Sequence, residues 1–115
     1  MSKILIIDDS RLSVSALQNI LSTQGHTVVG TAYSGEDGIN KAKELKPEVI
    51  CLDFVMPDID GKETALKLRS SGVNSKIVMI TQNEVPQNLR GEIQAAAYVI
   101  KPITANKIQE AFSTL

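Results

Sequence analysis

Short apolar runs alternate along the chain with longer segments in which apolar residues recur at helical spacing. Runs rich in Ile, Val and Leu predict strands, and apolar residues three and four positions apart predict amphipathic helices. Strands are expected at residues 4–7, 26–32, 49–52, 76–80 and 97–100. Helices are expected at about residues 12–21, 34–45, 61–72, 84–96 and 104–112. Each predicted strand is therefore followed by a predicted helix.

Polar residues mark the starts of several of these helices. Ser10, Ser34 and Thr104 stand where a side-chain hydroxyl caps the first turn of a helix. The fourth helical segment is weaker, because Pro86 and Gly91 interrupt it. The segment boundaries are thus best defined for the first, second and last helices.

Alternating strands and helices predict an α/β fold with a five-stranded parallel sheet. Each helical crossover returns the chain to the same end of the sheet, which makes neighbouring strands parallel. The runs at 49–52 and 76–80 have no polar alternate face, as expected of strands covered on both sides. The mixed run at 26–32 suits a sheet edge. We therefore predict a doubly wound sheet with helices on both faces, a three-layer sandwich.

Composition and charge narrow the classes of function. The 115 residues suffice for one domain, and 43% hydrophobic with 22% charged residues is typical of a folded soluble domain. A net charge of -1 and 3% aromatic residues disfavour direct nucleic-acid binding. The single cysteine, Cys51, lies in an apolar run and is predicted to be a buried, inert thiol. No apolar stretch has the length of a signal peptide or membrane span, so a cytoplasmic location without membrane contact is expected.

Polar residues follow the predicted strands at their carboxyl ends: Asp8 and Asp9 after the first, Asp53 after the third, Thr81 after the fourth, Lys101 after the fifth. Ligands of open parallel sheets bind beyond these ends, so we expect the five side chains in one crevice. Crowded carboxylates raise one another's pKa, and Mg²⁺, which prefers oxygen ligands, relieves the repulsion. The set predicts a site at which Asp53 attacks a phosphoryl group in line.

The sequence resembles the receiver domain of two-component response regulators over essentially all of residues 1–115. The resemblance is carried by "IIDDS" with Asp8 and Asp9, "DFVMPDIDG" with Asp53, "MIT" with Thr81, and "YVIKP" with Tyr98 and Lys101. It implies a flavodoxin-like sandwich with strand order 2-1-3-4-5. It also implies a phosphoacceptor regulator that assists its own phosphoryl transfer and dephosphorylation, and that is not an enzyme acting on free substrates.

The resemblance implies a role for each residue near the acids. Asp53 is the expected phosphoacceptor, and Lys101 is expected to contact the phosphoryl group. Mg²⁺ is expected on Asp9, Asp53 and the backbone carbonyl of Val55, with Asp8 contributing through water. The donor would be a histidine kinase or a histidine phosphotransfer protein.

The resemblance also implies how a signal leaves the site. Phosphorylation is expected to draw Thr81 inward and to let Tyr98 bury, which alters the surface of the fourth helix, fifth strand and fifth helix. A downstream target protein would read that surface, and the chain would be a monomer or a phosphorylation-dependent dimer. Without the resemblance, an aromatic such as Tyr98 in a terminal strand is more often a packing residue. The Lys101-Pro102 bond is expected to be cis.

Several positions depart from the family pattern. The stretch 81–101 is slightly short and contains Pro86; Gln82 stands where a small residue is usual, and Ile103 where an aromatic is common. These departures fall on the output surface rather than on the acids. Val55, two residues after Asp53, offers no polar group to a hydrolytic water, so we expect the phosphorylated form to be comparatively long-lived.

Alternative functions remain open. The chain ends at Leu115, soon after the last helix, so output is expected through another protein unless the chain is a fragment of a longer regulator. An aspartyl-nucleophile phosphatase would want a second acid at the position of Val55. A nucleotide-binding module lacks support, because neither GxGxxG nor GxxxxGK[ST] occurs. A pseudo-receiver used only for docking conflicts with the complete set of acids.

Overall fold

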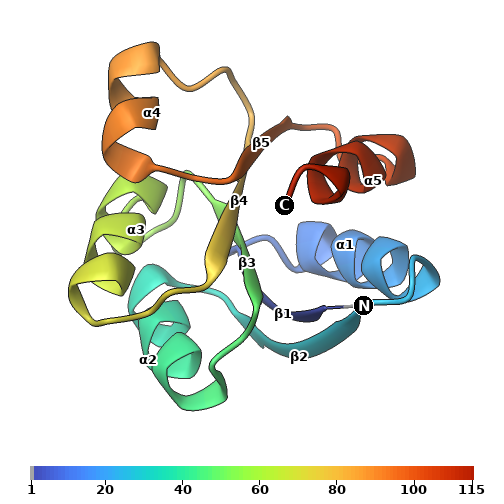
Figure 1. Cartoon of the computed structure of the whole chain (residues 1–115), viewed down its shortest axis with the longest axis horizontal. Coiled ribbons are helices and arrows are strands. Elements are labelled where there is room, and N and C mark those ends of the chain that lie inside the picture. Colours follow the sequence, from blue (N-terminus) through green and yellow to red (C-terminus); the bar gives the residue numbers. More distant parts are fainter. Residues whose placement is uncertain (1) are drawn as a thin grey trace.

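The computed structural model describes residues 2–115, in which five strands alternate with five helices (Figure 1). The strands are β1 (Lys3–Ile7), β2 (Thr27–Ala32), β3 (Val49–Asp53), β4 (Lys76–Thr81) and β5 (Ala97–Ile100). The helices are α1 (Arg11–Thr23), α2 (Gly35–Leu45), α3 (Gly61–Ser70), α4 (Gln87–Ile93) and α5 (Ala105–Ser113). All paired strands are parallel, in the order β2-β1-β3-β4-β5. The predicted fold class and strand order are confirmed.

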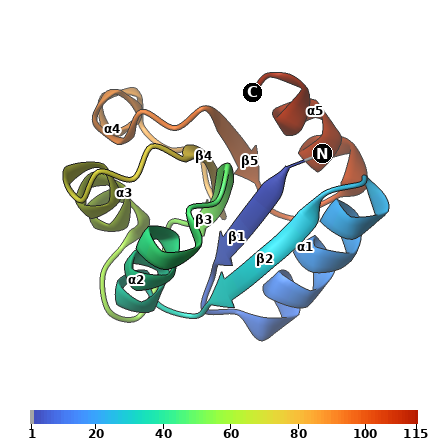
Figure 2. The same cartoon turned by 60° about the horizontal axis from the view of Figure 1, so that its bottom comes forward.

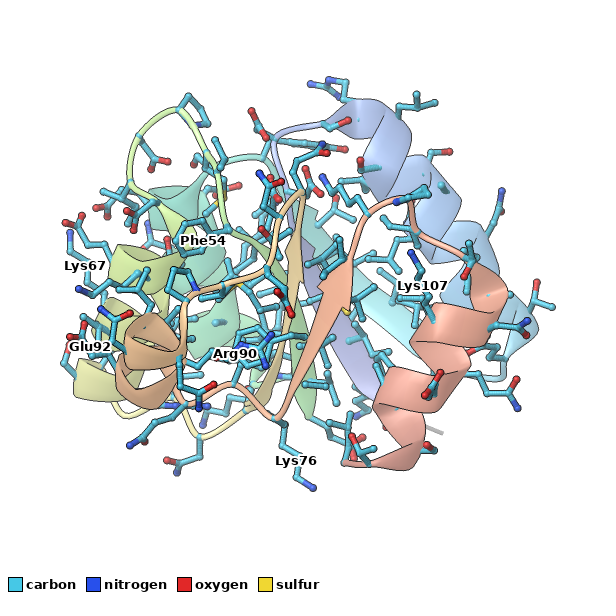
Figure 3. All side chains as sticks on the ribbon, turned by 90° about the horizontal axis from the view of Figure 1, so that it is seen from above. Phe54, Lys67, Lys76, Arg90, Glu92 and Lys107 are labelled. Atoms are coloured by element: carbon cyan, nitrogen blue, oxygen red, sulfur yellow. The ribbon has the colours of Figure 1, made fainter. Side chains whose placement is uncertain are left out.

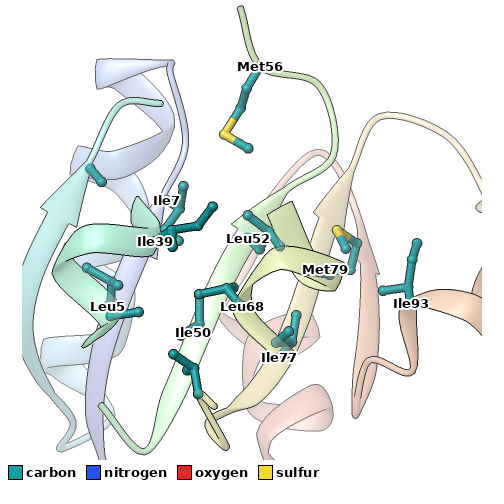
Figure 4. Packing of buried hydrophobic residues seen from close by; sticks show 14 of the residues in the cluster. Leu5, Ile7, Ile39, Ile50, Leu52, Met56, Leu68, Ile77, Met79 and Ile93 are labelled. Atoms are coloured by element: carbon teal, nitrogen blue, oxygen red, sulfur yellow. The ribbon is translucent and has the colours of Figure 1, made fainter. Parts of the chain in front are cut away.

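Helices cover both faces of the sheet. α1 and α5 lie on one face, and α2, α3 and α4 lie on the other (Figures 1 and 2). Successive strand residues alternate between the two faces: Leu52 packs in the cluster under α2–α4 (Figure 4), and Cys51 packs in the cluster under α1 and α5. Every residue of β3 is buried, as predicted for a strand without a polar face. Burial raises the pKa of the Cys51 thiol to about 12, so the thiol is inert at neutral pH.

The predicted helix caps are present. The hydroxyl oxygens of Ser10, Ser34 and Thr104 each accept a hydrogen bond from the backbone N–H three residues later, at 3.2 Å in all three cases. Each such bond satisfies one of the N–H groups that the first turn of a helix leaves without a partner, and contributes about 1 kcal/mol. Local sequence therefore fixes where α1, α2 and α5 begin.

The fourth helix is shorter than the predicted segment 84–96. Pro86 stands at its N-cap position and makes no side-chain capping bond, so the helix begins only at Gln87. Gln94 adopts a left-handed conformation with φ 54° and ends it after 7 residues. Val85 and Ile93 are buried at its two ends. Tertiary packing, rather than helical propensity, keeps this short segment helical.

Candidate functional site

Charged residues from three strand ends form one cluster at the carboxyl edge of the sheet. β1 pairs with β3, which brings the residues at the ends of these strands together. One carboxylate oxygen from each of Asp8, Asp9 and Asp53 lies within 4.8 Å of the others. The Nζ atom of Lys101 lies 3.4 Å from Oδ2 of Asp8 and 3.5 Å from Oδ1 of Asp53. The structure thus gathers the four charged residues that the sequence placed in one crevice.

Burial makes the repulsion between the carboxylates of this cluster costly. Asp8 and Asp53 are 3% and 6% exposed, whereas Asp9 is exposed. The N–H of Ser10 donates to Oδ1 of Asp8 at 2.9 Å and holds that carboxylate in place. Loss of solvation raises the pKa of Asp53 to about 6, the negative charge of Asp8 adds to the increase, and Lys101 opposes it. A cation bound here would relieve the repulsion.

Thr81 ends β4, the strand next to β3, and is 4% exposed. Its Oγ1 accepts a long hydrogen bond, 3.4 Å, from the N–H of Asn83. Its carbonyl accepts a 2.8 Å bond from the N–H of Lys101, which joins the ends of β4 and β5. The peptide bond between Lys101 and Pro102 is cis, as the resemblance implied.

The β3–α3 loop, residues 54–60, leaves the cluster directly after Asp53. Val55 is 65% exposed and brings no polar side chain to the site. At the far end of the loop, the N–H of Gly61 donates to the carbonyl of Phe54 at 2.6 Å. A Cβ atom on Gly61 would lie 2.7 Å from Cα of Phe54 and 2.8 Å from the carbonyl oxygen of Asp53. Only glycine allows the chain to fold back this closely onto the end of β3.

Asp58, in the same loop, has a role that the sequence did not reveal. Its Oδ1 accepts a bond from the N–H of Gly35 at 3.0 Å, and its Oδ2 accepts one from the N–H of Glu36 at 2.9 Å. The bond from Glu36 is the main reason that the pKa of Asp58 falls to about 2. Nothing in the local sequence indicates that this acid has partners in another helix.

Tyr98 lies on β5, at the surface between α4 and α5. The Arg90 guanidinium carbon lies 4.4 Å from the centre of the tyrosine ring, and the tyrosine hydroxyl donates to the carbonyl of Arg90 at 3.4 Å. Figure 3 shows Arg90 on α4 and Lys107 on α5, on opposite sides of β5. A hollow of about 770 Å³ runs along this strand, lined by Ala96, Ala97, Tyr98, Val99, Ile100, Lys107, Glu110, Ala111 and Thr114.

The carboxylate cluster fits a hard divalent cation. Asp8, Asp9 and Asp53 offer only oxygen donors, converging within 4.8 Å. Mg²⁺ prefers such ligands and retains several waters, and Asp9, on the exposed side of the cluster, faces solvent.

Comparison with known proteins gives a consistent result. The response regulator receiver domain family matches residues 4–113. The chain is 38% identical over 114 residues to the response regulator protein VraR of Staphylococcus saprophyticus, covering 95% of this chain but only 54% of VraR. It is 27% identical over 113 residues to the chemotaxis protein CheY of Thermotoga maritima, covering 96% of this chain and 94% of CheY. The crystal structure of Vibrio cholerae CheY4 superposes with a TM-score of 0.91 at 25% identity, covering 100% of this chain and 99% of CheY4.

The chain belongs to the response regulator receiver domain family. Members of this family are phosphoacceptor regulators, generally bind Mg²⁺, and interact with histidine kinases and downstream effectors. The class of function is therefore phosphorylation-dependent signalling in two-component systems. Within residues 2–115, no helix combines the length and the apolar character needed to cross a membrane.

Proposed function

We propose that residues 1–115 act as one receiver domain, in the cytoplasm, in which Asp53 accepts a phosphoryl group from the phosphohistidine of a histidine kinase or a histidine phosphotransfer protein. The observation that carries this proposal is the position of Lys101, whose Nζ lies 3.5 Å from Asp53 and 3.4 Å from Asp8. A cation fixed beside a buried carboxylate is well placed to neutralise the oxygens of an arriving phosphoryl group.

In the proposed transfer, a carboxylate oxygen of Asp53 attacks phosphorus in line with the bond to the histidine nitrogen. The P–N bond breaks with its electron pair passing to the imidazole, and a P–O bond to Asp53 forms. Since the pKa of Asp53 is about 6, the carboxylate is ionised and nucleophilic at neutral pH. Dephosphorylation is the attack of water on the same phosphorus, which releases inorganic phosphate and restores the carboxylate.

Mg²⁺ is the proposed cofactor. Its proposed ligands are Asp9, Asp53 and the backbone carbonyl of Val55, with Asp8 contributing through water. The convergence of three carboxylates within 4.8 Å supports this assignment. When bound, magnesium supplies positive charge that offsets the carboxylate repulsion and the charge on the phosphoryl oxygens.

Thr81 and Tyr98 are the proposed switch residues. The hydroxyl of Thr81 accepts a bond of 3.4 Å from the N–H of Asn83, which is long enough to be lost at little cost when the hydroxyl turns to donate to a phosphoryl oxygen. Tyr98 is half-buried beneath the Arg90 guanidinium, and its hydroxyl donates an equally long bond to the carbonyl of Arg90, so burying the ring further would break only one long hydrogen bond. The resulting change on α4, β5 and α5 would be read by a downstream protein or by a second copy in a dimer.

The test is phosphorylation by a small-molecule donor. The protein is incubated with acetyl phosphate and Mg²⁺, and its intact mass is measured before and after mild acid treatment. One acid-labile phosphoryl group is expected; chelation of the metal or the substitution Asp53→Ala should abolish it. Asp37→Ala, which removes an exposed acid on α2, should leave the label unchanged. A wild type without label, or an Asp53→Ala variant that still carries it, would overturn the proposal.

A further inference from the structure

The β3–α3 loop is fastened at both of its ends. The N–H of Phe54 donates to the carbonyl of Ile80 at 3.2 Å, and the N–H of Gly61 donates to the carbonyl of Phe54 at 2.6 Å. Between these bonds lie residues 55–60, including Val55, whose backbone carbonyl is the proposed metal ligand. A carbonyl that already has a fixed position binds a metal more tightly than one that must be ordered on binding, so the position of the middle of the loop matters as well.

Asp58 supplies a connection in the middle of the loop. It accepts one backbone N–H of α2 on each carboxylate oxygen, from Gly35 at 3.0 Å and from Glu36 at 2.9 Å. The N–H of Asp37, next along the helix, is taken by the hydroxyl of Ser34. Asp58 thus completes the cap of α2 from a loop more than twenty residues away.

The loop and the start of α2 also meet at close range. A Cβ atom on Gly35 would lie 2.4 Å from Cγ1 of Ile59 and 2.6 Å from Oγ1 of Thr64. Across the same junction, Nζ of Lys67 on α3 lies 3.1 Å from Oε1 of Glu36 on α2. Asp58 and Glu36 are exposed, so the bonds to Asp58 lie at the surface beside the close contact that Ile59 and Thr64 make with Gly35.

Two features restrict the backbone between Val55 and Asp58. Met56 is 9% exposed and projects from the loop toward the core under α2–α4 (Figure 4). Pro57 has a backbone φ fixed by its ring. A displacement of Asp58 would thus be transmitted to Val55 instead of being absorbed between them.

We propose that Asp58 is a positioning residue that holds the β3–α3 loop on the N-terminus of α2 and thereby sets the place of the Val55 carbonyl in the metal site. This inference rests on the proposed function, because it takes the Val55 carbonyl as a ligand. Asp58 itself does not touch the metal. Groups that hydrogen-bond directly to metal ligands typically change metal affinity by about 10–100-fold when they are removed; because Asp58 acts on the Val55 carbonyl only through the loop, an effect at the lower end, about 10-fold, is expected.

The test is the binding of Mg²⁺ itself. Titration calorimetry on the whole chain at pH 7.5 compares wild type with Asp58→Ala, Asp58→Asn and Asp37→Asn, and the melting temperature of each is measured without metal. We expect the Kd for Mg²⁺ to rise about 10-fold in Asp58→Ala. The rise should be smaller in Asp58→Asn, whose single carbonyl oxygen can still accept one N–H. Asp37→Asn removes a charge from the same helical turn without touching the loop, and its Kd should match the wild type.

Two results would overturn the inference. If Asp58→Ala melts at a lower temperature but binds Mg²⁺ with unchanged Kd, Asp58 only caps α2, and the proposed function stands. If the wild type binds no Mg²⁺, the metal site of the proposed function fails as well. Should Asp58→Ala not fold, Asp58→Asn decides by the same comparison of Kd values.

Discussion

Replacing the carboxylate of Asp53, the proposed phosphoacceptor, by its neutral isostere asparagine should stabilise the fold. Asp53 is 6% exposed, and burial, followed by the charge of Asp8, raises its pKa from the ordinary 3.8 to about 6. At pH values between 3.8 and about 6, the folded state binds more protons than the unfolded state. The free energy of unfolding therefore falls as the pH rises through this window, and the loss is complete above about pH 6. Asp53→Asn removes the charge while leaving Lys101 beside Asp8 at 3.4 Å.

The magnitude follows from the two pKa values. Each pH unit between them corresponds to about 1.4 kcal/mol, so ionised Asp53 costs the native state about 3 kcal/mol at pH 8. At pH 5 the folded carboxyl is mostly protonated but the unfolded one is mostly ionised, and the cost is about half as large. We expect Asp53→Asn to be more stable than the wild type by about 1–3 kcal/mol at pH 8, with a smaller difference at pH 5.

Urea unfolding followed by far-UV circular dichroism, in chelator at pH 8 and pH 5, measures this difference. Asp37→Asn, an exposed acid on α2, is the matched control and should change stability little at either pH. Saturating Mg²⁺ should stabilise the wild type more than Asp53→Asn and narrow the gap between them. Equal or lower stability of Asp53→Asn at pH 8, or a gap that widens at pH 5, would refute the reasoning.

Three further substitutions test neighbouring features. Val55→Asn should speed the loss of the phosphoryl group several-fold when the decay is followed by intact mass. The increase should stay below the rate acceleration of about 100-fold that a fully positioned general base supplies. An unchanged rate would contradict the role given to Val55. Gly61→Ala should cost about 2–3 kcal/mol in urea unfolding because its Cβ meets backbone at 2.7 Å, whereas Gly91→Ala, with open space around it, should be neutral or stabilising. Lys101→Met removes the cation beside Asp53 and should raise the pKa of that carboxyl further, measured by NMR titration; a lower pKa would contradict this electrostatic account.

Much of the fold was predictable because its signals are local. Apolar runs and helical spacing identified all five strands and five helices among the described residues, and the hydroxyls of Ser10, Ser34 and Thr104 capped the helices as predicted. The predicted limits of α4 were wrong. The sequence pattern extends past Pro86 and Gln94, but Pro86 delays the start of the helix and the left-handed Gln94 ends it. The strand order came from the family resemblance, since βα alternation alone leaves several orders open.

The charged cluster was predictable for a topological reason. Asp53 is the last residue of β3, Asp8 and Asp9 come just after β1, and Lys101 comes just after β5; a parallel sheet brings such positions to one edge. The bonds of Asp58 to α2 were not predictable, because they join residues 22 and 23 positions apart that carry no shared local pattern. For the same reason, only the structure reveals that the Arg90 guanidinium lies over the ring of Tyr98 on β5.

The most direct test of the account locates the phosphoryl group on the chain. After incubation with acetyl phosphate and Mg²⁺, borohydride reduction converts an aspartyl phosphate to homoserine, and peptide mass spectrometry identifies the reduced residue. Homoserine is expected at position 53 alone, and none when the metal is chelated. Homoserine at Asp8 or Asp9, or no reduced residue in a folded, metal-loaded sample, would contradict it.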